Sequence, residues 1–374
     1  MTEQYETIVR GGTVVTAADI CRADIGIRGD KIAAVGVDLG SAAHEIDARG
    51  KLVMPGGVDT HAHIEQVSAS GLFNADDWQS ATTSAALGGT TAVITFAAQH
   101  VGLDLMKVVD DYSAFAARGS IIDYSFHLIV ADPTEATLKV DLPALAERGL
   151  TSVKLFTTYD KLILDDEQVL DVLQVARDSG AFACIHAENH GVIKWMTKRL
   201  LAAGNHALRY HAEAHARIAE VEAINRIVRL AELVDQPVMI FHVSTAEGVA
   251  IVRDARARGL PIYAETCPQY LFLTAADLDR PGSEAAKWMC SPPPRNESDQ
   301  EALWRGLESN DLQCISSDHA PYAYDETGKL HKGRQPRFDQ VPSGLPGIGL
   351  RMPLLFDAMV SKSRLGPRKF VELT

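Results

Sequence analysis

The stretch GVDTHAHIE, residues 57–65, decides how the whole chain is interpreted. Its histidines follow apolar residues and a Pro55-Gly56-Gly57 break, and this pattern predicts a strand that ends in two histidines. Because side chains of an extended strand alternate with a period of two, His61 and His63 are expected to point to the same side. Most histidine pairs of this spacing are surface or core residues. The pair therefore indicates a metal site only if other segments supply further ligands.

From Val53 onward, apolar strand-like segments alternate with helical ones, such as Asp166–Asp178 and Ala216–Leu233. Eight strands alternating with helices is the count of a (β/α)8 barrel. An open doubly wound sheet has the same alternation, but no Gly-x-Gly-x-x-Gly follows a strand to support dinucleotide binding. The expected strands are Val53–His63, Thr91–Ala97, Ile121–Val130, Ser152–Thr157, Ala181–His186, Val238–Val243, Ile262–Glu265 and Gln313–Ser317.

The chain before this alternation has only strand signals. Tyr5–Val15 is one predicted strand, and Ile25–Arg28 and Lys31–Val35 form a predicted hairpin across the two-residue turn Gly29-Asp30. We therefore expect a small β-domain over residues 1–52 and the barrel over residues 53–374.

Composition excludes several classes of partner. The formal net charge of −13 over 374 residues disfavours nucleic acid and anionic membranes, which require clustered Lys and Arg. No run of 18 apolar residues predicts a membrane span, and the N-terminus does not resemble a signal peptide. Five cysteines without a Cys-x-x-Cys pair indicate a reduced, cytoplasmic protein.

Residues with metal-binding chemistry stand at the carboxyl ends of five expected strands, where barrel enzymes place their active sites. Imidazole and carboxylate groups bind zinc, and a lysine within an apolar strand is unusual because an unpaired buried ammonium is strongly disfavoured. Each histidine alone is better explained as a hydrogen-bonded core residue, but their coincidence at one end of the barrel favours a metal centre. The residues are His61, His63, Lys154, His186, His242 and Asp318.

Two interpretations of Lys154 remain open at this point. It could pair with a carboxylate such as Asp318. Alternatively, carbon dioxide could convert its amine to a carbamate, whose two oxygens are able to bridge two metal ions.

These motifs resemble the cyclic amidohydrolases of the amidohydrolase superfamily, and most closely the dihydropyrimidinase/hydantoinase family. The resemblance implies a (β/α)8 barrel with a small β-sandwich, and two Zn²⁺ per subunit bridged by N6-carboxylated Lys154. One metal would be held by His61, His63, Lys154 and Asp318, and the other by Lys154, His186 and His242. The motifs that carry the resemblance are Gly57–Glu65, Val153–Asp160, Ile185–Asn189, Phe241–Glu247, Ala264–Leu271, Met289–Arg295 and Ser316–Tyr322.

The same resemblance implies a reaction. A hydroxide that bridges the metals would attack the carbonyl of a dihydropyrimidine or hydantoin ring and give an N-carbamoyl amino acid. Asp318 would move the proton from the water to the leaving nitrogen, and Tyr159 would assist oxyanion binding. Ser291, in a Ser-Pro-Pro segment, and Ser343 would contact the substrate. The expected partner is a small cyclic amide, and family members are commonly homotetramers.

Several features narrow the choice within the superfamily. No arginine follows the first histidine pair, where Ile64-Glu65-Gln66 stands, which argues against a dihydroorotase. An allantoinase-like hydrolase of another cyclic ureide or imide is the alternative, but such relatives usually differ at the tyrosine and the Ser-Pro-Pro segment, so Tyr159 and Ser291 favour the hydantoinase side. Ser343 replaces a common asparagine and Ala214-His215-Ala216-Arg217 replaces Ser-Arg-Pro, so ordinary dihydrouracil is not assigned as the physiological substrate. Some relatives are non-enzymatic scaffolds that have lost metal ligands, but all six positions are filled here.

The last residues, Lys369–Thr374, have the pattern of a barrel helix that is beginning. Members of the family continue with further strands of the sandwich. We therefore expect the C-terminal half of the sandwich to be absent from this chain.

Overall fold

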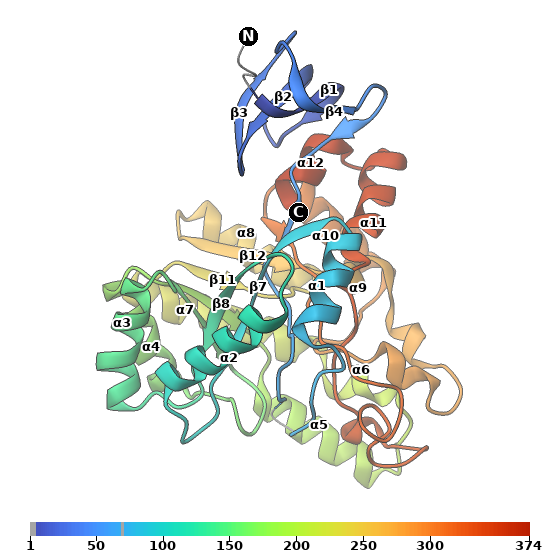
Figure 1. The fold of residues 1–374 in the computed structure, drawn as a ribbon. Helices are drawn as coiled ribbons and strands as arrows, with labels where there is room; N and C mark the ends of the chain where they lie inside the picture. Colours follow the sequence, from blue (N-terminus) through green and yellow to red (C-terminus); the bar gives the residue numbers. More distant parts are fainter. Residues whose placement is uncertain (1–4, 69–70) are drawn as a thin grey trace. The chain divides into compact units, whose positions relative to one another are not determined.

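The computed structural model describes residues 5–68 and 71–374, which divide into two compact units (Figure 1). The smaller unit takes in the chain up to Gly57 together with Leu354–Thr374, and the larger unit is Val58–Pro353. The division falls within helix α11 (Arg351–Phe356).

The smaller unit is built on a five-stranded sheet of order β3-β2-β1-β4, in which β5 also pairs with β1. β1 runs antiparallel to β2 and parallel to β4 and β5, and the predicted hairpin across Gly29-Asp30 is present between β2 and β3. Helix α12 (Gly366–Leu373) packs against β1. The strands are β1 (Tyr5–Val15), β2 (Ile20–Arg28), β3 (Lys31–Gly36), β4 (Ala42–Asp47) and β5 (Leu52–Val53).

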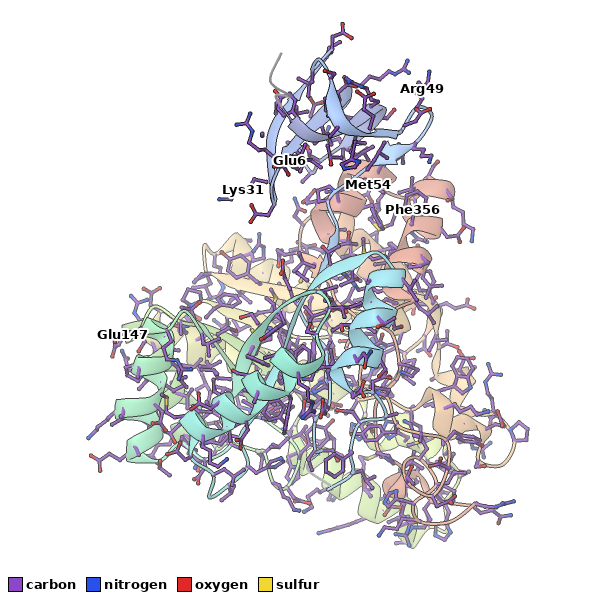
Figure 2. All side chains as sticks on the ribbon, in the orientation of Figure 1. Glu6, Lys31, Arg49, Met54, Glu147 and Phe356 are labelled. Carbon is purple, nitrogen blue, oxygen red and sulfur yellow. The ribbon has the colours of Figure 1, made fainter. Side chains whose placement is uncertain are left out.

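Alternating side chains give the small sheet one packed face. Val14, Ala23 and Ile25 are buried together, because residues two apart on neighbouring strands share a face. Charged side chains such as Glu6 on β1 and Lys31 on β3 are exposed (Figure 2).

The larger unit is a barrel of eight strands, as predicted. The order is β13-β12-β11-β10-β9-β8-β7-β6, with parallel pairing between sequence neighbours. A parallel bridge between Ala62 and His319 joins the segments that follow the first and last of these strands. The strands are β6 (Gly57–Asp59), β7 (Thr90–Ala98), β8 (Asp123–Ile129), β9 (Ser152–Phe156), β10 (Phe182–His186), β11 (Val238–Ile240), β12 (Ile262–Thr266) and β13 (Cys314–Ile315).

Helices connect the strands and pack against them (Figure 1). Several begin at a residue whose side chain accepts a hydrogen bond from the first turn, such as Asp77 before α1 and Thr245 before α8. The α-helices of the barrel are α1 (Trp78–Leu87), α2 (Leu105–Gly119), α3 (Leu142–Glu147), α4 (Asp166–Asp178), α5 (His190–Ala202), α6 (Tyr210–Ala214), α7 (Arg217–Val234), α8 (Ala246–Ala257), α9 (Pro268–Phe272) and α10 (Glu297–Glu308). Shorter 3-10 or π turns are Thr137–Asp141, Ala275–Leu278, Glu284–Trp288, Phe338–Gln340 and Asp357–Ser361.

The first and last strands of the barrel are also tied by a buried arginine. The Arg351 guanidinium donates to the carbonyl of Ile315 on β13 and to the hydroxyl of Thr90 on β7, at 2.9 and 3.2 Å. Its Nε lies 3.8 Å from the Asp59 carboxylate on β6. One side chain therefore links three strands where the sheet closes on itself.

Three predicted strands are markedly shorter than expected. One of them, Val238–Val243, is reduced to β11, and His242 lies beyond its end with a positive φ of 41°. The predicted strand Val53–His63 is two strands, β5 and β6, because Pro55 interrupts the backbone donors between them. His61 and His63 therefore follow β6 instead of lying within it. The predicted strand Gln313–Ser317 is reduced to β13, because the backbone turns away from the ladder and Asp318 has a positive φ of 46°.

No helix in residues 5–68 or 71–374 is both long enough and apolar enough to span a membrane.

Candidate metal centre and active site

One cavity of the larger unit, about 320 Å³ in volume, collects the predicted site. Every residue that the sequence analysis singled out for metal binding, catalysis or substrate contact lines it. These residues are His61, His63, Lys154, Tyr159, His186, His242, Ser291, Asp318 and Ser343. They come from strand ends and loops spread over more than 280 positions of the chain, so the barrel brings them together as expected.

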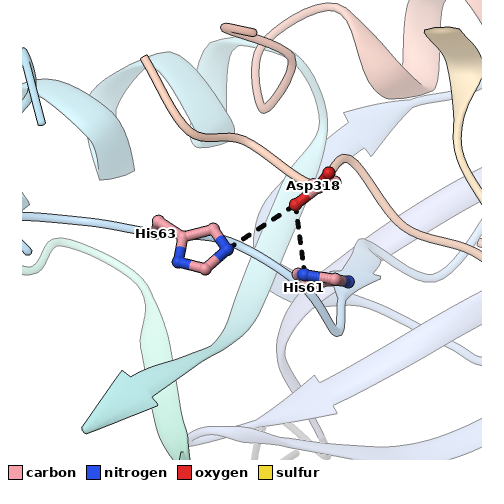
Figure 3. Close-up of side chains that lie close together, drawn as sticks. All are labelled: His61, His63 and Asp318. Carbon is pink, nitrogen blue, oxygen red and sulfur yellow. Dashed lines mark ion pairs between the residues drawn. The ribbon is translucent and has the colours of Figure 1, made fainter. Parts of the chain in front are cut away.

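Three of these side chains form a compact cluster (Figure 3). The Nε2 atoms of His61 and His63 lie 3.1 and 3.6 Å from Oδ1 of Asp318. One ligand atom from each residue lies within 4.8 Å of the other two. Two imidazoles and a carboxylate at this spacing are a donor set that suits zinc.

Buried partners orient both histidines of the cluster. Nδ1 of His61 contacts Oε1 of Glu265 at 2.5 Å, and Nδ1 of His63 contacts Oε1 of Gln66 at 2.8 Å. These contacts occupy the ring nitrogen remote from Asp318, which leaves Nε2 of each ring on the side of the cluster. Metal-binding histidines commonly have such a second partner.

The charges of the cluster stabilise one another. Burial alone would lower the pKa of His61, but the carboxylates of Asp318 and Glu265 outweigh it and raise that pKa. Burial would raise the pKa of Asp318, but His61 and His63 hold it well below 3.8. Asp318 is therefore ionised at neutral pH.

His186 and His242 lie beside this cluster. Their ring centroids are 4.4 Å apart, and that of His242 is 5.4 Å from that of His61. Nδ1 of His242 is buried without a hydrogen-bond partner among the described residues. An orphaned ring nitrogen at this position is free to accept a metal ion.

Lys154 does not pair with Asp318. Among the residues that the structure describes, its buried Nζ has no hydrogen-bond partner, and it lies 4.0 Å from the centroid of the Phe241 ring. Burial lowers the pKa of Lys154 to about 8 and outweighs the opposing effects of Cys184, Glu265 and Asp318. An amine that releases its proton this readily is suited to react with carbon dioxide. The donors of the cavity therefore fit the metal centre that the resemblance implies.

Another buried carboxylate connects the histidine side of the cavity with Ser291. Glu188 is fully buried and accepts from the Ser291 hydroxyl at 2.6 Å. It also contacts Nε2 of His186 at 2.8 Å and Nδ1 of His215 at 2.9 Å. Tyr159 lies nearby, with its ring centroid 5.2 Å from that of His186. Burial, reinforced by the charge of Glu188, raises the pKa of Tyr159 well above 10.

The sequence analysis missed Glu188, Glu265 and His215 as parts of the site. Glu188 and Glu265 lie at or just after the carboxyl ends of strands, and this position is the sequence feature that could have indicated them. His215 had been noted only as a departure from the family pattern.

Comparison with known proteins places this arrangement in a family. The profile of the Amidohydrolase family matches residues 52–344. The D-hydantoinase of Streptomyces coelicolor is 41% identical over 98% of this chain and 79% of its own length, and that of Rhizobium radiobacter is 39% identical over the same shares. The crystal structure of dihydropyrimidinase from Brevibacillus agri, 37% identical, matches 98% of this chain and 79% of its own with a TM-score of 0.94. The chain therefore belongs to the amidohydrolase family and is a cyclic amidohydrolase of its dihydropyrimidinase and D-hydantoinase branch.

Proposed function

We propose that the protein hydrolyses a small cyclic amide of the hydantoin or dihydropyrimidine type to an N-carbamoyl amino acid. The observation that carries the proposal is the single cavity that gathers all nine predicted residues around a buried His-His-Asp cluster. The similarity to D-hydantoinases and to a dihydropyrimidinase supports the type of ring.

The metal centre we propose holds two Zn²⁺ ions. His61, His63 and Asp318 would hold one ion, His186 and His242 would hold the other, and Lys154, carboxylated at its amine, would contribute to both. When bound, such ions lower the pKa of water and polarise a carbonyl oxygen.

The residues of the chain then have separate tasks. Asp318 is ionised and buried beside the cluster, so it accepts the proton of the attacking water and delivers it to the ring nitrogen as the carbon–nitrogen bond breaks. Tyr159 keeps its hydroxyl proton at neutral pH and can donate a hydrogen bond to the developing oxyanion. Ser291 and Ser343 line the same cavity, where they would contact the ring.

A hydrolysis panel on the zinc-loaded protein tests the reaction. It should contain dihydrouracil, hydantoin, 5-substituted hydantoins of both hands, allantoin and dihydroorotate. We expect ring opening of hydantoins or dihydrouracil, measured as N-carbamoyl product. Activity confined to allantoin or dihydroorotate would contradict the proposed substrate class.

Lys154 provides the test of the metal centre. Replacing it with alanine is expected to abolish hydrolysis and to reduce the zinc content together, because the bridging group is lost. Lys154→Arg is the matched variant, since it keeps a long cationic side chain that forms no carbamate. Full activity in either variant would refute the bridging role. The role would also be refuted if the unsubstituted protein contained less than one zinc per chain after treatment with zinc and bicarbonate.

We also propose that the protein works as a cytoplasmic homotetramer. The free state of Cys21, Cys184, Cys267, Cys290 and Cys314 is compatible with a reducing compartment. Light scattering of the purified protein should give four times the chain mass of 40.5 kDa.

A further inference from the structure

Two cavity segments carry the proposed substrate contacts, and a third residue joins them. Ser291 lines the cavity from the segment of residues 289–292, and Ser343 lines it together with the rest of residues 341–344. Nζ of Lys329 donates to the carbonyl of Met289 at 3.0 Å and to the carbonyl of Pro342 at 2.7 Å. Lys329 thus bridges the two segments within two residues of each serine.

Lys329 makes these bonds from a buried position, which is unfavourable for a charged amine. The residue is only 3% exposed, and in the described part of the chain the hydrogen-bond partners of its Nζ are two backbone carbonyls and no carboxylate. Burial lowers the pKa of Lys329 to about 7, because a charged amine is disfavoured away from water. A buried amine without a counter-ion is stabilised here by the two carbonyls, so the bridge accounts for the residue type.

The other bonds of residues 289–292 explain what the bridge orients. The carbonyl of Cys290 accepts from Nε2 of His211 at 2.7 Å, and that of Pro292 accepts from the Tyr270 hydroxyl at 2.8 Å. Of these four carbonyls, only that of Ser291 has no hydrogen-bond donor among the described residues. The Ser291 carbonyl therefore remains available to a ligand, and the carbonyls of the other three residues in this segment are all hydrogen-bonded.

A direct bond between the two segments completes the arrangement. The backbone N–H of Gly344 donates to the same Met289 carbonyl at 2.9 Å. Without Lys329, this single bond would remain between them at Met289, and the Pro342 carbonyl beside Ser343 would lose the donor that the structure gives it. The segments would then be free to move relative to one another.

We propose that Lys329 is a positioning residue that fixes the backbone of Ser291 relative to that of Ser343, and thereby sets the affinity for the cyclic amide. The inference rests on the proposed function, because it assigns the ring to these two segments. Lys329 contacts neither the metal-binding residues nor Tyr159 in the structure, so it acts through substrate binding.

Kinetics of two variants test this role. Lys329→Met removes the donors at nearly constant length, and we expect KM to rise about tenfold, since the substrate would then have to order the two loosened segments when it binds. The value of kcat and the zinc content should change less than twofold. Lys329→Gln retains N–H donors and should give an intermediate KM. The exposed Lys332, changed to methionine, is the matched control and should leave KM unaltered.

Hydrogen exchange supplies a readout that does not require hydrolysis. In Lys329→Met, amides of residues 289–292 and 341–344 should exchange faster than in the unsubstituted protein, while the strands of the barrel stay unchanged. If Lys329→Met does not fold, Lys329→Gln carries both measurements. Unaltered exchange in these segments overturns the proposal, and so does faster exchange with an unaltered KM. An unsubstituted, zinc-loaded protein without activity on the panel would instead refute the proposed function.

Discussion

Glu265 shows how one buried carboxylate orients a histidine that we propose as a metal ligand. It is fully buried, and its contact with Nδ1 of His61 determines which ring nitrogen remains for the cluster. It also contributes to the raised pKa of His61, after the effects of burial and of Asp318. An imidazole with such a partner is a stronger and better oriented ligand.

We therefore expect Glu265→Gln to weaken zinc binding by about 10- to 100-fold, because the amide keeps the shape of the side chain but removes its charge. Competition with a chromophoric chelator would measure the affinity. Glu308→Gln makes the same change at an exposed position and should leave zinc affinity unaltered. Equal affinities of Glu265→Gln and the unsubstituted protein would show that Glu265 does not orient His61.

A site residue could be predicted from the sequence where its own type and its immediate neighbours make it unusual. A lysine in an apolar strand, as at Lys154, and a histidine at a strand end, as at His186, are unusual enough to be noticed. Glu265 is different, because its partner His61 lies 204 positions away and no local pattern connects them. Glu188 likewise acquires its role only when the fold brings His215 and Ser291 to it.

At the scale of elements, the alternation of strands and helices predicted the barrel, whereas the ends of strands were predicted less well. Hydrophobic periodicity determines which segments are buried, but not where the backbone leaves the ladder. Asp318 has a positive φ and follows a strand of only two residues. Its side chain reaches His61 and His63 because the backbone turns there, which periodicity does not reveal.

Contacts between helices give the fold a dependence on pH. Asp299, in the first turn of α10, accepts hydrogen bonds from Arg217 at the start of α7 at 2.6 and 2.8 Å, and from the N–H of Ala246 at the start of α8 at 3.0 Å. Burial would raise the pKa of Asp299, but these donors outweigh it and the pKa lies below 3.8. The stabilisation is therefore complete well above pH 3.8 and is lost as the pH falls through the folded-state pKa.

Asp299→Asn should accordingly lower the free energy of unfolding by about 1–3 kcal/mol at pH 7, because hydrogen bonds to a charged group are lost or weakened. The difference from the unsubstituted protein should shrink as the pH is lowered from 5 towards 3. Urea denaturation at several pH values would measure both effects. A difference that stays constant over this range would mean that the ionised carboxylate is not what joins these helices.

At the scale of the whole molecule, closing the barrel and assembling the cluster of His61, His63 and Asp318 depend on the same contact. Ala62, between the two cluster histidines, pairs with His319, which follows Asp318 directly. The N–H of His63 also donates to the His319 carbonyl at 2.6 Å. The cluster thus draws one ligand segment from the beginning of the barrel and one from its end, and a metal ion bound there would stabilise the closed form.

Removing zinc should therefore lower the melting temperature of the protein. A ligand present at about a thousand times its Kd stabilises the folded state by about 4 kcal/mol. Removing it from a chain of this size should lower the melting temperature by roughly 5–10 °C. Scanning calorimetry before and after chelation, with zinc content measured in each sample, would record the change. His61→Asn removes a proposed metal ligand from the segment at the beginning of the barrel. The melting temperature of this variant should therefore respond much less to the chelator. If chelation leaves the unsubstituted protein's melting temperature unaltered, the metal ion does not hold the two ends of the barrel together.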